Sequence, residues 1–104
     1  MIDKLNAIKD RFIEVSELIV QPEIISDMQN YIKLSKEYKD LEPIVEKINQ
    51  YIKIIDNISE AKDILKNEED LELKDLAKAD LDESLDLKDI LEEEVKLLLI
   101  PKDP

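Results

Sequence analysis

The chain has 104 residues, and its 27 Asp and Glu outnumber its 15 Lys and Arg, which gives a formal net charge of -12. A nucleic-acid surface needs clustered cations to displace phosphate counterions, so this charge argues against direct RNA or DNA binding. Glycine, histidine and cysteine are all absent, which excludes phosphate-cradling glycine loops, histidine-dependent triads, disulfides and the preferred zinc ligands.

The first predicted element is a helix over about 2–20, because apolar residues recur at alternating steps of three and four. The residues of this face are Leu5, Ile8, Phe12, Val15 and Ile19. The helix should end before Pro22, since proline disfavours helical geometry at the preceding Gln21. Ser26 followed by Gln29 has the pattern of a capping box, which predicts that the next helix begins there.

The second helix is expected over about 26–66, a length of about 60 Å. It carries an unbroken a/d heptad, which Ile58 and Leu65 prolong. The heptad positions are Tyr31, Leu34, Tyr38, Leu41, Val45, Ile48, Ile52 and Ile55. Pro43 removes a backbone hydrogen bond here, but it falls at an f position and the heptad keeps its phase. We therefore predict one continuous helix, kinked with Pro43 on its outer face, in preference to a break near Glu42.

The third helix is expected over about 70–99 and is ended by Pro101. Asn67 is expected to cap it, while the acidic residues 68–70 suit the positive end of the helix. The apolar stripe changes phase once along Leu73, Ala77, Leu81 and Leu85, then Leu87, Leu91, Val95 and Leu98. Short connections make neighbouring helices antiparallel. The predicted fold class is all-α, an elongated antiparallel three-helix assembly in which the outer helices cover opposite halves of a long kinked central helix.

The negative charge is concentrated in residues 67–95, which hold 13 acidic residues against three lysines, a net charge of -10. Residues 1–66 hold 13 acidic and 10 basic residues. Two interpretations stay open. The acidic region is a solvated helix surface, or it is a face that steers toward a basic partner.

A search for chemistry finds only weak patterns. Oxygen-bearing residues alternate over 80–86 as in a calcium loop, but Leu85 stands where glycine is needed and Leu91 where a bidentate glutamate belongs. The alternating residues are Asp80, Asp82, Ser84 and Asp86. The acidic run 92–94 lacks the cleft that a tuned carboxylate pair requires. We predict no catalytic, cofactor-binding or metal-binding residues and no cofactor, so the chain is not itself an enzyme.

Three segments together resemble a known family: "LSKEYKDLEPIVEKINQY" at 34–51, "LAKAD" at 76–80 and above all "LLLIPKDP" at 97–104. They resemble the bacterial class I peptide chain release factors, in particular the type that reads UAA and UAG. In that type a helical N-terminal domain is followed by an apolar run and Pro-Lys-Asp-Pro. The resemblance covers the whole chain, and the ending is its most specific part.

The resemblance implies an N-terminal helical domain over 1–100, with 101–104 as the start of a linker to missing downstream domains. In the family, those domains read the stop codon and carry a Gly-Gly-Gln loop for ester hydrolysis. A chain without glycine cannot contain that loop, so no catalytic or decoding residue is carried over. The implied role is an accessory one in translation termination.

The resemblance also implies partners and a location. The intact factor would contact the GTPase-associated region of the ribosome, at the stalk base of the large subunit, and other termination factors are further candidates. The location would be cytoplasmic, in agreement with the lack of a signal-peptide pattern and of an apolar run of about 18 residues. No membrane contact and no direct nucleic-acid contact by this domain are expected.

The alternative function is a structural helical coiled-coil adaptor that mediates protein-protein contacts and shares the ending by chance. The downstream gene sequence separates the two hypotheses. A Gly-Gly-Gln motif in frame would support the release factor, and a stop codon directly after Pro104 would remove it.

Overall fold

The computed structural model describes residues 1–101, which form four helices and no strand. The helices are α1 (Ile2–Leu18), α2 (Pro22–Ile25), α3 (Met28–Asn67) and α4 (Leu71–Leu98). The chain divides into two compact units, Met1–Glu46 and Lys47–Pro104, and α3 contributes residues to both. The all-α class with a long central helix is confirmed, while the short α2 was not predicted. Most of the expected linker, residues 102–104, lies outside the described residues.

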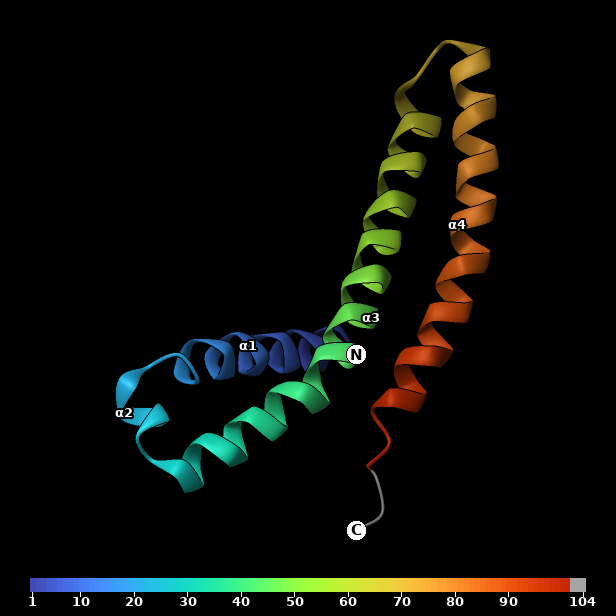
Figure 1. The fold of residues 1–104 in the computed structure, drawn as a ribbon. Helices are drawn as coiled ribbons and strands as arrows, with labels where there is room; N and C mark the ends of the chain where they lie inside the picture. The colour runs from blue at the N-terminus through green and yellow to red at the C-terminus, as the bar shows by residue number, and fades with distance from the viewer. Residues whose placement is uncertain (102–104) are drawn as a thin grey trace. The chain divides into compact units, whose positions relative to one another are not determined.

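In the first unit, α1 and the beginning of α3 run antiparallel and are connected through α2 (Figure 1). The rings of Phe12 and Tyr38 stack with their centroids 4.9 Å apart, which agrees with a packing role for Tyr38. Arg11 donates two parallel hydrogen bonds to Glu37, Nε to Oε1 at 2.6 Å and Nη2 to Oε2 at 2.8 Å. These hydrogen bonds lower the pKa of the Glu37 carboxyl. The buried apolar residues of this unit are Leu5, Val15, Leu34 and Val45.

The connection between α1 and α3 corrects the predicted start of the central helix. Gln21 is extended, with φ -80 and ψ 135, as expected before proline. Pro22 then begins α2, which ends at Ile25. Ser26 is its C-cap, and its Oγ donates to the Glu23 carbonyl at 3.1 Å. The Ser26 hydroxyl therefore forms its hydrogen bond at the end of α2 and does not cap α3. The capping-box prediction is wrong. Asp27 Oδ1 instead accepts from the Asn30 amide, at 3.3 Å, in the first turn of α3.

The central helix is continuous through Pro43, as predicted, and Pro43 is exposed. The kink stays a prediction. Further along α3, the buried position moves from the heptad to its neighbour, since Tyr51 is buried while Ile52 is only half-buried. Neighbouring residues of a helix lie about 100° apart around its axis, and Tyr51 belongs to the unit in which α3 packs on α4. The move therefore marks a change of packing partner.

In the second unit, the remainder of α3 and α4 form another antiparallel pair (Figure 1). Their core cluster joins Ile58 and Ala61 of α3 to Leu81 of α4, with two half-buried neighbours, Ile54 and Leu65. The sequence predicted that different helices pack on the two parts of α3, and this is confirmed within each unit.

The face of α4 that packs on α3 differs from the predicted stripe. Its buried residues are Ala77, Leu81, Ser84 and Val95. Four residues placed in the stripe are exposed: Leu73, Leu85, Leu87 and Leu98. The buried positions follow one regular helical period, so Ser84 takes the inward place even though its neighbour Leu85 is the more apolar. Ala77, Leu81 and Val95 are buried as predicted, so the prediction failed at the two ends of the stripe and at its change of phase.

The turn between α3 and α4 is made by acidic side chains. Glu68 Oε1 accepts hydrogen bonds from the amides of Glu69 and Asp70, both at 3.1 Å. Asp70 Oδ1 accepts from the Glu72 amide at 2.9 Å and caps α4. Asn67 is the last residue of α3, so its predicted role as the cap is wrong.

Candidate functional site

The acidic residues that alternate over 80–86 lie on one continuous helix and do not converge. Ser84 is buried, whereas Asp80, Asp82 and Asp86 are exposed. Asp82 lies 3.2 Å from Lys78 Nζ in an exposed ion pair. Among residues 1–101, no cluster of three or more His, Cys, Asp or Glu is placed to hold a metal ion.

The acidic run at 92–94 is paired with lysines. The Glu92 carboxylate lies 3.7 Å from Lys88 Nζ and 3.5 Å from Lys96 Nζ, and Glu94 Oε2 lies 2.5 Å from Lys47 Nζ. Partly exposed pairs of this kind contribute about 0–1 kcal/mol each. They neutralise charge along the α3–α4 pair and form no nucleophile-and-base arrangement.

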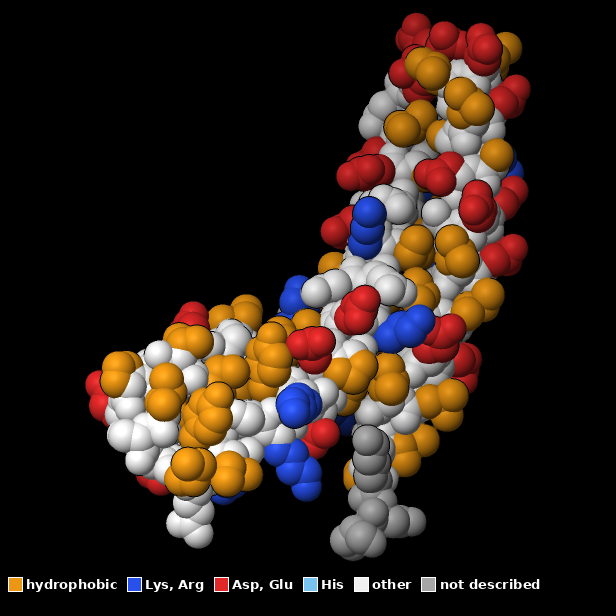
Figure 2. Space-filling model, in the orientation of Figure 1, with side chains coloured by type: hydrophobic (Ala, Val, Ile, Leu, Met, Phe, Trp, Pro, Cys, Tyr) orange, Lys and Arg blue, Asp and Glu red, His pale blue; other side chains and the backbone are white. Residues whose placement is uncertain are grey.

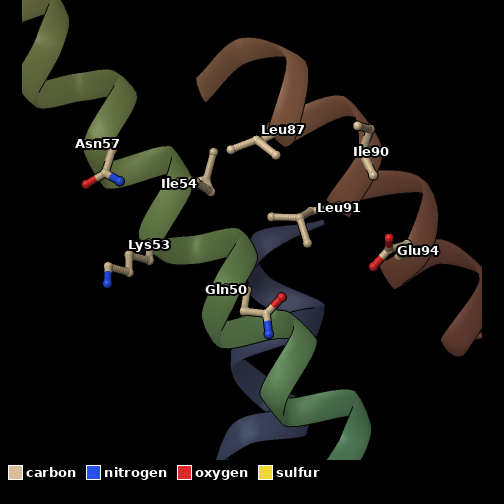
Figure 3. Close-up of a pocket in the computed structure, with 8 residues that line it drawn as sticks. All are labelled: Gln50, Lys53, Ile54, Asn57, Leu87, Ile90, Leu91 and Glu94. Carbon is tan, nitrogen blue, oxygen red and sulfur yellow. The ribbon is translucent and has the colours of Figure 1, made fainter. Parts of the chain in front are cut away.

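An open groove between α3 and α4, with a volume of about 480 Å³, is the principal surface feature of the second unit (Figure 3). It is lined by Gln50, Lys53, Ile54, Asn57, Leu87, Ile90, Leu91 and Glu94. Leu87 and Leu91 of α4 point toward Ile54 of α3 and form its apolar floor (Figure 3). We call this feature the groove.

Polar groups stand at the edges of the groove. The amides of Gln50 and Asn57 offer donors and acceptors from positions about two turns apart on α3. At the other edge, Glu94 Oε2 is shielded from solvent and lies 2.5 Å from Lys47 Nζ, its ion-pair partner. An apolar floor with a few polar groups at its rim is suited to binding a side chain or a helix. The lining residues include no Ser, Thr, Cys, His or Tyr.

A second hollow lies near the α3–α4 turn. It is lined by Ile64, Glu68, Leu73, Leu76, Ala77 and Asp80, and we call it the loop-end hollow. Leu76 is 64% exposed, although it lies beside the buried Ala77. Figure 2 shows hydrophobic side chains gathered in separate groups along the α3–α4 pair, with acidic side chains between them.

Below the surface, Tyr51 is the one buried titratable residue among residues 1–101 whose pKa is clearly displaced. Burial of the phenol raises its pKa, and the negative charge of Glu92 raises it further. Lys88 and Lys96 act in the opposite direction. The neutral phenol is therefore the form that this structure stabilises.

This gives a prediction for alkaline pH. The folded-state pKa of Tyr51 lies above the ordinary value of 10.0. The contribution of this residue to the free energy of unfolding is therefore complete below pH 10 and is lost as the pH rises through the folded pKa. Tyr51→Phe should therefore reduce the alkaline loss of stability, measured by urea unfolding at pH values from 8 upward. Tyr31→Phe is the matched control and should leave that loss in place. An alkaline loss of equal size in Tyr51→Phe would contradict the assignment.

Sequence reasoning predicted no site residue and so missed both hollows. Exposed leucines and isoleucines of α4 recur at steps of three and four beside the buried stripe, but this spacing does not distinguish exposed from buried residues. Leu73 and Leu87 were placed in the predicted core stripe, whereas Leu76 and Ile90 were assigned no role.

Comparison with known proteins finds one family over nearly the whole chain. Residues 8–104 match the family described as the PCRF domain. The chain is 45% identical to peptide chain release factor 1 of Bacteroides fragilis, 47% to that of Flavobacterium johnsoniae and 50% to that of Cytophaga hutchinsonii. Each match covers 100% of this chain but only 28%, 29% and 29% of the relative. No solved structure matches.

Proposed function

The chain belongs to the PCRF domain family, and from this premise we propose that it is the N-terminal accessory domain of a bacterial peptide chain release factor. In that role it acts in translation termination at UAA and UAG codons. The observation that carries the proposal is alignment of the whole chain, at 45% to 50% identity, with relatives named peptide chain release factor 1. The chain spans less than a third of those relatives, so the proposal concerns one part of a longer factor.

We propose that this N-terminal domain is not catalytic. A Gly-Gly-Gln loop needs glycine, and the chain has none. Glu37 and Glu94 are both engaged in ion pairs on helices. Hydrolysis and codon reading are therefore assigned to the remainder of the intact factor.

We assign the domain a docking role on the ribosome in the cytoplasm. Its proposed contact is the stalk-base region of the large subunit, with other termination factors as further partners. The net charge of -12 supports contact with protein and opposes contact with the RNA phosphates. The apolar groove between α3 and α4 supports the same preference.

A single-turnover peptide-release assay tests this role. The intact factor is compared with a variant lacking residues 1–104, at limiting and at saturating factor, on ribosomes stopped at UAA or UAG. We expect the truncated factor to keep stop-dependent hydrolysis at saturation and to lose activity mainly at limiting concentration. The reason is that remote contacts contribute binding energy, whereas bond breaking is performed elsewhere.

The isolated 104-residue chain and a buffer blank are the controls. The chain alone should release no peptide above the blank. Hydrolysis by the chain alone would contradict the non-catalytic role, and complete loss of release by the truncated factor at saturation would contradict the docking role.

A further inference from the structure

One flank of α4 repeats a heptad of its own beside the face that packs on α3. Starting at residue 73, steps of three and four lead to residue 97, and we call these positions the flank stripe. They are Leu73, Leu76, Asp80, Glu83, Leu87, Ile90, Glu94 and Leu97. Positions at this spacing lie on one side of a helix. Because α4 already buries a different stripe on α3, the flank stripe is a second one. Glu94 pairs with Lys47 of α3, while Leu76, Ile90 and Leu97 are each more than half exposed.

The flank stripe connects the two hollows. Its first apolar pair, Leu73 and Leu76, lines the loop-end hollow, and its second, Leu87 and Ile90, lines the groove. The pairs are two heptads apart, about 21 Å along the helix axis. Leu76 is 64% exposed and Ile90 is 56% exposed, so both have apolar surface available for burial.

Between the two apolar pairs, the stripe is acidic. Asp80 and Glu83 are exposed, and neither makes an ion pair with any residue in 1–101. Lys78, the nearest lysine to Asp80 along α4, pairs with Asp82. The centre of the flank stripe therefore keeps an unbalanced negative charge.

We propose that the flank stripe is a docking surface for a basic amphipathic helix of another protein. Apolar residues two heptads apart on that helix fill the loop-end hollow and the groove, and Lys or Arg in its middle heptad faces Asp80 and Glu83. The apolar contacts supply affinity, while the charge pairs fix the register and the choice of partner.

The pattern argues against a second copy of this chain as the occupant. Over residues 73–90 the order apolar, acidic, apolar reads the same in both directions, so two antiparallel copies that pair these apolar residues would place Asp80 and Glu83 against their own equivalents. Like charges placed opposite each other disfavour such a pairing. An anionic lipid surface would meet the same repulsion. A basic amphipathic helix can fill both hollows and balance the negative charge between them. This inference does not depend on any role in translation termination.

The experiment measures binding of labelled synthetic helices to the 104-residue chain by fluorescence anisotropy. The probe peptide has three heptads, with leucine at the a and d positions of the outer heptads and lysine at those of the middle heptad. The matched control peptide has glutamate in place of those lysines. We expect the lysine peptide to bind about tenfold or more tightly than the glutamate peptide.

Variants of the chain locate the binding. Leu76→Ser and Ile90→Ser should each weaken binding of the lysine peptide about tenfold, because each removes an anchor from one hollow. Leu71→Ser is the control, since Leu71 is 74% exposed but lies off the stripe, and it should leave binding within about twofold. The double reversal Asp80→Lys with Glu83→Lys should exchange the preference, so that the glutamate peptide binds more tightly.

Several outcomes would overturn the proposal. They are equal binding of the two peptides, no binding up to about 1 mM peptide, or an effect of Leu71→Ser as large as that of Ile90→Ser. Sedimentation showing a dimer that Ile90→Ser dissociates would assign the stripe to self-association instead. Binding to anionic vesicles that Leu76→Ser and Ile90→Ser abolish would assign it to a lipid surface. Circular dichroism of each variant establishes that it is still helical, as exposed positions should allow.

Discussion

Replacing Ile48 by alanine is expected to lower the free energy of unfolding by about 2–4 kcal/mol. The Ile48 side chain is 0% exposed and is among the largest fully buried ones. Truncation removes its transfer energy and leaves a cavity, because a continuous helix such as α3 can close around the gap only in part. Denaturant unfolding followed by circular dichroism measures the loss.

The matched control is Glu60→Ala on the same helix. Glu60 is exposed, so its replacement should change the free energy of unfolding by no more than about 0.5 kcal/mol. Equal losses for the two variants would mean that the buried face of α3 has been assigned incorrectly.

The second large effect is expected in α1. Leu5 is 0% exposed, and Leu5→Ala should cost about 2–5 kcal/mol. The loss should fall first on the unit Met1–Glu46, because Leu5 belongs to its core. Amide hydrogen exchange can resolve this, with amides of α1 losing protection before those of α4.

Ile13→Ala provides the comparison for Leu5→Ala. Ile13 lies on the same helix and is 51% exposed, so the same loss of side-chain volume leaves no buried cavity. Its replacement should stay within about 0.5–1 kcal/mol of the original protein. If the two variants lost stability equally, packing of α1 against α3 would not be the source of its stability.

The sequence predicted the helices well because their periodicity is strong. The continuity of α3 through Pro43 followed from the unchanged phase of Leu41 and Val45, and the family resemblance taken from the segments at 34–51, 76–80 and 97–104 is confirmed by the match over residues 8–104. The predictions that failed concern positions where two neighbouring elements or residues compete for one role. The Ser26 hydroxyl forms its hydrogen bond at the end of α2, so it does not cap α3.

The hollows on α4 could not be predicted from composition, since a leucine at heptad spacing has the same pattern whether it is buried or exposed. Leu85 and Ser84 show this most clearly. Hydrophobicity favours Leu85 at the inward position, yet the regular period of α4 turns Ser84 inward. Deciding between adjacent stripes of one helix requires the position of the other helix, and a single sequence does not contain it.

The division of α3 between two units has a consequence for the nascent chain. Synthesis proceeds from the N-terminus, so every residue of Met1–Glu46 is made before any residue of α4. The first unit can bury Leu5 and Val15 early, whereas Ile58 and Ala61 must wait for Leu81, their partner in the second core. At ~5–20 residues per second, that half of α3 stays uncovered for roughly a few seconds. During that interval the growing polypeptide exposes an apolar helical face to the exit-site chaperones and to neighbouring chains.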